Sequence, residues 1–394
     1  MLARILIFLL ILLILPIYCI DRMALKHRWR GVWRLLYYLP NIILIVTLVA
    51  LSIGESYSSE AAQIKSLAIC ATMTLAIPET LVAILMGICV LIGKKWPAVR
   101  RIGFPCSAFI GGVIGIMLLY GFTLGYRNIE QTDFTYQSRK IPYSFDGYRI
   151  VQISDFHIGT ISSHGDVIED IVNTINAAQP DLVLFTGDLV NYDAREILPH
   201  QNTLKKIQAK DGIFSVMGNH DYAQYFRWPS AADSVANIHL LQDLQKSMGW
   251  QLLLNEHAFV KRGNDSIAII GVENCGRPPF PNLADLDGAM CGLPEGVLKI
   301  LLSHDPTHWR DEVLPQSNID LTLSGHTHGM QFRIGNFSPA AWIYDEWGGA
   351  YFEGERALYV NQGIGSVMIP FRLGAWPEIT VITLRTAENG KKQN

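Results

Sequence analysis

Apolar residues follow two different patterns along the 394-residue chain. In the first part they form four long runs, at residues 5–20, 32–53, 67–92 and 104–126. A helix needs about 20 apolar residues to cross a bilayer, so three runs are long enough and the first is slightly short. After residue 126 the apolar runs become short and are separated by charged and turn-forming residues. This change predicts a folded domain outside the membrane.

The second part alternates strand-like and helix-like patterns. Apolar residues at helical spacing predict a helix at residues 164–178. Two further helices are expected at residues 196–209 and 232–248. Helices separate the early strands, whereas the later strands follow one another more closely, which predicts an α/β domain with two packed sheets and outer helices. Short apolar runs predict strands at residues 134–136, 148–154, 181–186, 212–217, 251–254, 267–272, 298–302, 319–323, 357–360 and 379–384.

Composition and charge agree with a partly membrane-embedded chain. Charged residues make up 17%, below the roughly 25% that is usual for soluble domains. The net charge of −3 gives no polybasic surface, so nucleic acid is not an expected partner. We predict a four-span transmembrane region at residues 1–126, a C-terminal domain at residues 127–387 and a polar tail at residues 388–394.

The first apolar run has an alternative interpretation as a cleaved signal peptide. It lacks a small-x-small cleavage site, and its basic residues follow it instead of preceding it. We therefore expect an uncleaved span. The basic residues after the run are Arg22, Lys26, Arg28 and Arg30.

The loops between the spans predict the orientation of the chain. The first and third loops are basic, and basic loops stay in the cytoplasm. The second loop is acidic, with Glu55 and Glu60 against Lys65. Both termini and the C-terminal domain are thus predicted to lie outside the cytoplasm. The basic residues of the third loop are Lys94, Lys95, Arg100 and Arg101.

Glu79 and the cysteines each leave two interpretations open. Glu79 lies near the middle of the third span, where a carboxylate can mark a functional site. We favour a structural role for it, as a protonated side chain hydrogen-bonded to a neighbouring helix, for example to Asn41. Cys275 and Cys291 are the only cysteines of the C-terminal domain, and they could form a disulfide or remain free. The other four, which we expect to act as small core residues, are Cys19, Cys70, Cys89 and Cys106.

Polar ligand-type residues follow five of the predicted strands. Parallel strands place their carboxyl ends at one edge of a sheet, where α/β proteins bind ligands. The mixed oxygen and imidazole donors, without thiolate, suit Mn, Fe or Zn and also Mg. They are too numerous for one open ion, so two ions about 3.5–4 Å apart and bridged by a carboxylate are expected. The groups are Asp155 with His157, Asp188, Asn219 with His220, His304, and His326 with His328.

These groups stand in motifs, and the motifs resemble those of the calcineurin-like metallophosphoesterase family. The motifs are D-x-H, G-D, G-N-H-D, a lone histidine and G-H-x-H, in this order. S-H-D-P at residues 303–306 is similar to the bacterial membrane-associated branch, and Met330 departs from that branch, which usually has glycine there. The resemblance covers residues 130–385 and implies a four-layer α/β/β/α sandwich. It also implies a multi-pass protein of the inner membrane.

The resemblance also implies a role for each residue. Asp155, His157, Asp188 and His328 would bind one ion, and Asp188, Asn219, His304 and His326 the other. His220 would stabilise charge or protonate the leaving group, and Asp221 would orient the His220 ring. The ions would activate a water for in-line attack on a phosphoester.

Aromatic residues in the nearby loops raise the question of the substrate. They could contact the bilayer and admit a phospholipid or an envelope phosphodiester, or pack at a sheet edge. Those that follow Asp221 could also line the pocket. Two rival functions remain: a membrane sensor or transport-associated protein that binds phosphate without turnover, and a cytoplasmic pyrophosphatase of reversed topology. The aromatic residues are Tyr222, Tyr225, Phe226, Trp228, Phe280, Trp342, Tyr344, Trp347, Tyr351 and Phe352.

Overall fold

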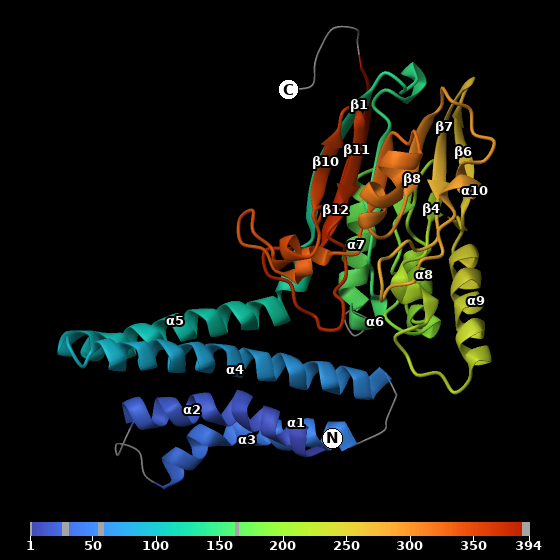
Figure 1. Cartoon of the computed structure of the whole chain (residues 1–394). Helices are drawn as coiled ribbons and strands as arrows, with labels where there is room; N and C mark the ends of the chain where they lie inside the picture. The colour runs from blue at the N-terminus through green and yellow to red at the C-terminus, as the bar shows by residue number, and fades with distance from the viewer. Residues whose placement is uncertain (1, 26–30, 54–58, 162–164, 388–394) are drawn as a thin grey trace. The chain divides into compact units, whose positions relative to one another are not determined.

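The computed structural model describes residues 2–25, 31–53, 59–161 and 165–387 (Figure 1). The chain divides into two compact units, Met1–Leu124 and Gly125–Asn394. We call them the membrane unit and the sandwich unit. The predicted polar tail at residues 388–394 lies outside the described residues.

The membrane unit consists of helices that are long and apolar enough to cross a bilayer. The candidate spans found in the described segments are Leu6–Ala24, Val32–Leu51, Ile64–Ile92 and Pro97–Thr123. Only 6% to 33% of each span is buried within the unit, so most apolar side chains face outward, as contact with lipid requires. The four-helix prediction is confirmed. The elements are α1 (Leu2–Leu9), η1 (Leu10–Ile14), α2 (Leu15–Ile20), η2 (Asp21–Leu25), α3 (Val32–Ile53), α4 (Ser59–Ile92) and α5 (Pro97–Thr123).

Glu79 is held by the hydrogen bond expected for its structural role. Asn41 Nδ2 donates to Glu79 Oε2 at 2.7 Å and to the carbonyl oxygen of Leu13 at 2.7 Å. One amide thus links three helical segments of the unit. A buried polar group that finds such partners avoids most of its desolvation cost.

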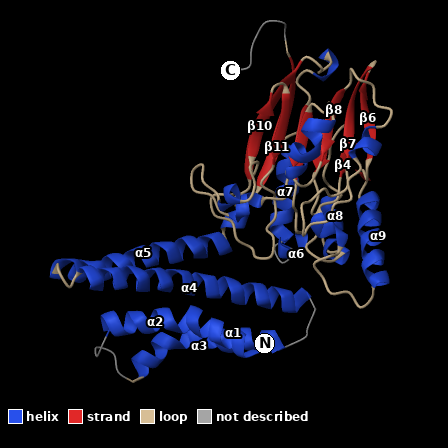
Figure 2. Cartoon of the chain, in the orientation of Figure 1, coloured by secondary structure: helices blue, strands red, loops and turns tan. Residues whose placement is uncertain are grey.

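The sandwich unit is built on two six-stranded sheets (Figure 2). Each has a parallel centre, because strands β2 to β5 and β7, β8, β9 and β11 pair in parallel. The first sheet has the order β1 (Glu130–Ser138), β12 (Glu378–Thr386), β2 (Arg149–Ile153), β3 (Leu182–Phe185), β4 (Ile213–Ser215), β5 (Trp250–Leu252). The second has the order β10 (Gly349–Glu353), β11 (Arg356–Val360), β9 (Leu321–Ser324), β8 (Leu298–Leu302), β7 (Asp265–Gly271), β6 (Glu256–Arg262).

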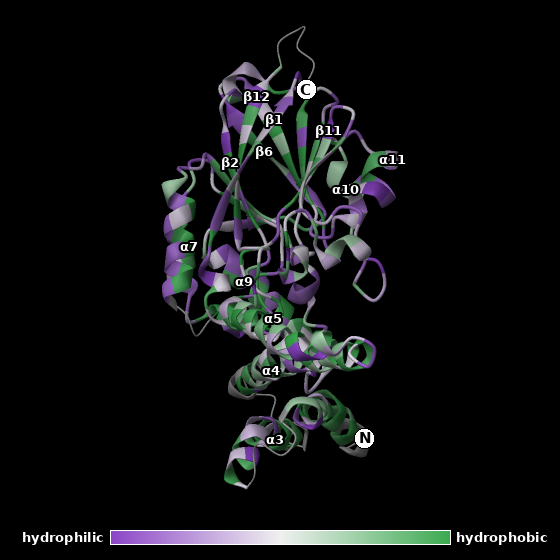
Figure 3. Cartoon of the chain, turned by 90° about the vertical axis from the view of Figure 1, so that its left-hand side faces the viewer, coloured by the Kyte–Doolittle hydropathy of each residue, from purple (hydrophilic) through white to green (hydrophobic). Residues whose placement is uncertain are grey.

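Helices cover the outer faces of both sheets, as Figure 3 shows with the sheets seen edge-on. α7 (Gly165–Ala177) lies outside the first sheet, and α10 (Leu286–Met290) and α11 (Leu314–Gln316) lie outside the second. The described outer helices also include α9 (Ala231–Ser247). This is the predicted four-layer α/β/β/α arrangement.

Three buried apolar clusters fill the spaces between these layers. The central cluster joins the inner faces of both sheets, for example Leu184 of β3 and Ile300 of β8. A second packs α7 and α9 on the first sheet, and a third packs Trp309 on the second. Burial of these residues fixes both sheets together, so loops at the carboxyl ends of their parallel strands meet.

The helix predicted at residues 196–209 is wrong in extent. The structure has a 3-10 turn, η5 (Ala194–Ile197), and one short helix, α8 (Gln201–Leu204). Pro199 lies between them, and proline interrupts a helix because it lacks the amide proton. β6 and β10 were not predicted, and both are edge strands with largely exposed or half-buried side chains.

Candidate metal centre

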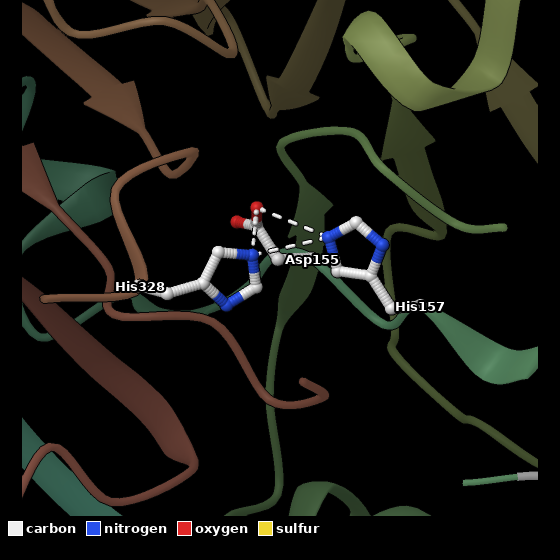
Figure 4. Close-up of side chains that lie close together, drawn as sticks. All are labelled: Asp155, His157 and His328. Carbon is white, nitrogen blue, oxygen red and sulfur yellow. Dashed lines mark hydrogen bonds and ion pairs between the residues drawn. The ribbon is translucent and has the colours of Figure 1, made fainter. Parts of the chain in front are cut away.

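One cluster of ligand-type side chains lies where the loops after β2 and β9 meet (Figure 4). His328 Nε2 is 3.1 Å from Asp155 Oδ1 and 3.1 Å from His157 Nε2. All three side chains are buried. Asp155 and His157, which the sequence predicts to converge, thus point at one centre together with a residue from far along the chain.

A second cluster is formed by residues that follow β3, β4, β8 and β9. His304 Nε2 lies 3.1 Å from Asn219 Oδ1 and 3.2 Å from His326 Nδ1. Asp188 Oδ2 lies 3.2 Å from His304 Nε2. The structure therefore brings together every residue that the sequence predicts as a metal ligand.

Asp188 connects the two clusters through a single oxygen atom. Its Oδ2 is 3.2 Å from His304 Nε2 of the second cluster and 3.5 Å from His157 Nε2 of the first. A carboxylate in this position can bind both ions of a two-metal site.

The backbone at these positions is strained. A positive φ costs a non-glycine residue about 1–3 kcal/mol and occurs mainly at functional sites. Asp155 is held in this conformation by its amide, which donates to Gly187 O at 2.9 Å. In these backbone conformations the side chains point toward the two clusters. Candidate ligands with φ between 41° and 71° are Asp155, His157, Asp188, His326 and His328.

The motif glycines make room for the carboxylates. Gly187 has a φ of 96°, a conformation that glycine adopts without strain. The φ angles of Gly218 and Gly325 are not positive. A Cβ at Gly218 would collide with the Asp188 carboxylate, and one at Gly325 with the Asp155 carboxylate. Close approach, not backbone freedom, explains these two glycines.

The protonation states of the cluster suit a metal. Burial alone would raise the pKa of Asp155 and Asp188, but the facing His328 and His304 rings hold both pKa values below their usual range. Burial lowers the pKa of His157, His326 and His328. Ionised carboxylates and neutral imidazoles are the forms that bind metal.

His304 is the exception among these histidines. Burial alone would lower the pKa of His304, but Asp188 raises it to about 10. Its ring therefore holds a positive charge beside carboxylates, at the position where a metal cation would replace that charge.

The donor set fits two divalent ions. Metal–nitrogen and metal–oxygen bonds of about 2.0–2.2 Å place neighbouring ligand atoms roughly 3 Å apart. The separations described above, 3.1 to 3.5 Å, are close to that value. His157 Nδ1 finds no hydrogen-bond partner among the described residues, and Nε2 is the ring nitrogen that faces His328 and Asp188.

The prediction that Asp221 orients the His220 ring is wrong. The carboxylate of Asp221 accepts hydrogen bonds from the backbone amides of Gly218, Asp188 and Leu189 at 2.9–3.0 Å. His220 Nδ1 instead donates to the carbonyl oxygen of Asn191 at 2.9 Å. Asp221 therefore shapes the loops that carry Asp188 and Asn219, and a backbone carbonyl fixes the imidazole.

Comparison with known proteins agrees with this geometry. The family model of calcineurin-like phosphoesterases matches residues 148–330. The uncharacterized metallophosphoesterase YkuE of Bacillus subtilis (strain 168) is 31% identical over 302 residues, which cover 71% of this chain and 96% of that protein. This chain belongs to the calcineurin-like phosphoesterase family. The resemblance inferred from the motifs is thereby confirmed.

Other members of the calcineurin-like phosphoesterase family carry membrane segments as well. A transmembrane protein with metallophosphoesterase domain from Danio rerio is 28% identical over 284 residues, covering 70% of this chain and 62% of that protein.

The solved phosphopantetheinyl hydrolase PptH of Mycobacterium tuberculosis has a TM-score of 0.35 at 14% identity, covering 55% of this chain and 89% of that one. Family membership implies a phosphoester substrate and divalent metals.

Sequence reasoning missed one buried residue of this calcineurin-like phosphoesterase site, Arg372. Its guanidinium is fully buried and donates from Nη2 to His328 Nδ1 at 3.0 Å. It also donates to the carbonyl oxygens of Gln362 and Gly363 at 2.8 and 3.0 Å. Arg372 follows no strand and stands in no motif that we identified, so only the folded chain shows its contact with the ligand.

Aromatic side chains line the calcineurin-like phosphoesterase site on the side of the second cluster. The Tyr344 hydroxyl lies 3.1 Å from His326 Nε2, and the ring of Phe280 stands edge-on to His326 at 4.8 Å. Tyr225 accepts a hydrogen bond from Asn219 Nδ2 at 2.9 Å and stacks on His220 at 4.3 Å. For Tyr225, the structure supports the pocket-lining alternative, and Phe280 and Tyr344, for which the sequence does not suggest that role, lie against the same site.

Proposed function

We propose that this chain is a membrane-anchored phosphoesterase that uses two divalent metal ions. The observation that carries the proposal is Asp188 Oδ2, which lies within 3.5 Å of imidazole nitrogens from both clusters. The hydrolase activity itself rests on family membership. The donor set supports Mn, Fe or Zn, with Mg as a further candidate.

The ligands divide between the two ions as the motifs suggest. Asp155, His157 and His328 would hold one ion, Asn219, His304 and His326 the other, and Asp188 would bind both. Such an ion pair lowers the pKa of a bound water and neutralises charge on the phosphoryl oxygens. The chain's own contribution is to hold seven donors in place on strained loops before the substrate arrives.

His220 is proposed as the catalytic residue that does not bind metal. Its Nδ1 proton is committed to Asn191 O, and its ring is partly exposed, unlike the buried His157 ring 4.8 Å away. Nε2 is thus left to meet the substrate. From there it can stabilise developing charge or donate a proton to the leaving oxygen.

An exposed apolar rim next to the site supports a lipid-linked phosphoester as substrate. The rim residues expose between 39% and 77% of their surface. Such a surface on a chain with four candidate spans suits a bilayer interface. The rim consists of Met330, Ile334, Phe337, Trp342, Ile343 and Met368.

The rim lies close to the first residue of the sandwich unit. Leu373 N donates to Gln331 O at 3.0 Å, and Arg333 N donates to Leu373 O at 2.8 Å. Gly125, the first residue of the unit, packs against Arg372 so closely that a Cβ would collide. The last candidate span ends at Thr123, two residues earlier. We propose a phospholipid or an envelope phosphodiester as the substrate, on the extracytoplasmic side that the basic loops predict.

A panel of substrates tests the proposal directly. The purified full-length chain, loaded with Mn²⁺, Zn²⁺, Fe²⁺ or Mg²⁺, would be assayed against soluble phosphomonoesters, soluble diesters and phospholipids in mixed micelles. We expect turnover, and faster turnover with lipid esters. Binding without turnover for every substrate would favour the sensor alternative.

A variant of His220 tests the assigned roles. His220→Ala should retain its metal and lose roughly 10²–10⁴-fold in kcat, the usual contribution of general acid–base catalysis. Metal content is measured by elemental analysis in parallel with kcat. Wild-type kcat in the metal-loaded variant would contradict the role.

A reporter fused to the C-terminus tests the proposed orientation. An alkaline phosphatase fusion should be active and a cytoplasmic fluorescent reporter should not be. The opposite result would support the cytoplasmic pyrophosphatase alternative.

A further inference from the structure

A separate group of ligand-type side chains lies outside the phosphoesterase clusters. Cys275 belongs to the loop after β7, and His308 and Glu312 lie at and within η7 (Trp309–Val313). One ligand atom from each lies within 4.8 Å of the other two. Glu312 Oε2 is 3.5 Å from His308 Nε2, and Glu312 Oε1 is 4.0 Å from Cys275 Sγ.

The His308 ring is oriented as a metal ligand would be. Its Nδ1 lies 2.8 Å from Ser303 Oγ. This hydroxyl can accept a hydrogen bond from Nδ1–H and so fixes the plane of the ring. Its Nε2 is buried and has no hydrogen-bond partner within the described part of the chain. A histidine that binds metal through one nitrogen usually donates its other N–H to a neighbouring acceptor. This Nε2 faces Glu312, and Cys275 offers a ligand atom within 4.8 Å of one offered by His308.

Two other uses of Cys275 fit the structure less well. Cys275 and Cys291 are both free thiols, with Cys275 buried and Cys291 exposed, so the disulfide considered from the sequence is not formed. A nucleophilic thiol needs a lowered pKa, whereas burial raises the pKa of Cys275 to about 12. Glu312 faces Nε2 of His308, and Nδ1 is held by the Ser303 hydroxyl, so no carboxylate holds Nδ1 as in a catalytic triad.

We propose that Cys275, His308 and Glu312 form a zinc site distinct from the phosphoesterase centre. A thiolate, an imidazole and a carboxylate are ligands that Zn²⁺ accepts, at about 2.0–2.3 Å. Two of the three ligand pairs lie 3.5 and 4.0 Å apart and the third within 4.8 Å, so the side chains need to move together by a small distance around such an ion. Binding releases the Cys275 thiol proton to solvent, and a water completes the coordination. The Glu312 side chain is 33% exposed, which leaves an entry path.

The zinc would brace a loop that reaches the phosphoesterase centre. The loop closes on itself, because Gly276 N donates to Pro281 O at 3.0 Å. It carries Phe280, whose ring packs on His326. Zinc would tie Cys275 of this loop to η7 and thereby hold Phe280 in place. This inference does not depend on the proposed catalytic activity.

Cobalt substitution tests the site with a signal that the phosphoesterase centre cannot produce. The full-length protein would be stripped of metal with a chelator and titrated with Co²⁺ or Zn²⁺. Thiolate bound to Co²⁺ gives a charge-transfer absorption band in the near ultraviolet, and the phosphoesterase ligands include no thiolate. The wild type should show this band and bind one more ion per chain than Cys275→Ser.

Two further variants make the result decisive. Cys291→Ser removes the other thiol of the sandwich unit and should keep the band. Glu312→Gln alters a partly exposed side chain, so folding should survive, and it should weaken Co²⁺ binding at this site by roughly 10–100-fold or more. A wild type without the band, a band that persists in Cys275→Ser, or a band lost in Cys291→Ser would overturn the proposal.

Discussion

The two halves of the metal centre differ in what surrounds them. Asp155, His157 and His328 are enclosed by the protein, and the fully buried Arg372 stands behind them. The other half ends in His326, whose ring faces the aromatic side chains of Tyr344 and Phe280. The first half is built to hold its ion, whereas the second also borders the space that a substrate would enter.

Arg372 explains how the enclosed half remains stable. A buried guanidinium is costly unless its N–H groups find acceptors, and burial lowers the pKa of Arg372 to about 10. Its donors reach the carbonyl oxygens of Gly365, Ala375 and Gln362 as well as the His328 ring. It therefore ties the loop after β11 to the candidate metal ligand His328, and we regard it as a positioning residue.

Asp188 faces both halves of the metal centre, so a substitution there should affect both of them equally. Asp188→Asn removes a negative charge from the oxygen that faces both halves, so both should lose metal. We expect activity to fall by about a thousandfold or more, since metal ions supply several kcal/mol of charge stabilisation. Elemental analysis and kcat measure the two effects.

The control for this variant is Asp243→Asn, on the exposed face of α9. It changes the net charge equally and should leave metal and activity unchanged. If Asp188→Asn kept one ion tightly bound, the shared-ligand assignment would fail.

Changing Arg372 should affect mainly the enclosed half. Arg372→Met leaves several carbonyl oxygens and His328 Nδ1 without a donor, so we expect a loss of about 3 kcal/mol or more in the free energy of unfolding. Affinity for the ion at Asp155, His157 and His328 should fall roughly 10–100-fold, as for other residues that orient ligands. Chemical denaturation and stepwise metal titration measure these quantities.

Arg372→Lys separates charge from geometry. Lysine keeps the charge but not the planar fork, so it should restore only part of the metal affinity. Equal weakening of both ions in Arg372→Met, with unchanged stability, would contradict a role confined to one half.

Tyr344 gives the corresponding test on the open half. Tyr344→Phe removes one hydroxyl 3.1 Å from His326 Nε2, and a single hydrogen bond contributes about 0.5–1.5 kcal/mol. Activity should therefore fall by about two- to tenfold, with stability nearly unchanged. Tyr143→Phe, at a residue 87% exposed, is the matched control. If Tyr344→Phe lowered the free energy of unfolding as much as Arg372→Met, the two halves would be equally rigid.

How far the sequence predicts each half depends on the same difference. The ligands follow apolar runs that become buried strands, so Asp155, Asp188 and His304 could be placed at strand ends from periodicity alone. Arg372 and Asn191 could not, because Arg372 meets His328 and Asn191 meets His220 only across long stretches of chain. The edge strand β6 could not, because most of its side chains are exposed or half-buried and give no apolar run. The role predicted for Asp221 failed for that reason: backbone amides, which no motif lists, compete for its carboxylate.

Met330 should give the smallest effect of these changes. It has a φ of 47° and lies directly after Gly329, whose φ is 52°. A side chain in this conformation costs about 1–2 kcal/mol, and glycine costs about 0.4–1 kcal/mol more entropy on folding. Met330→Gly should thus stabilise the fold by up to about 1 kcal/mol without changing metal content. Gly329→Ala should do the reverse, because its Cβ would lie 2.9 Å from Gln362 Oε1. Equal thermal unfolding temperatures for the two variants would show that backbone strain next to His328 does not limit stability.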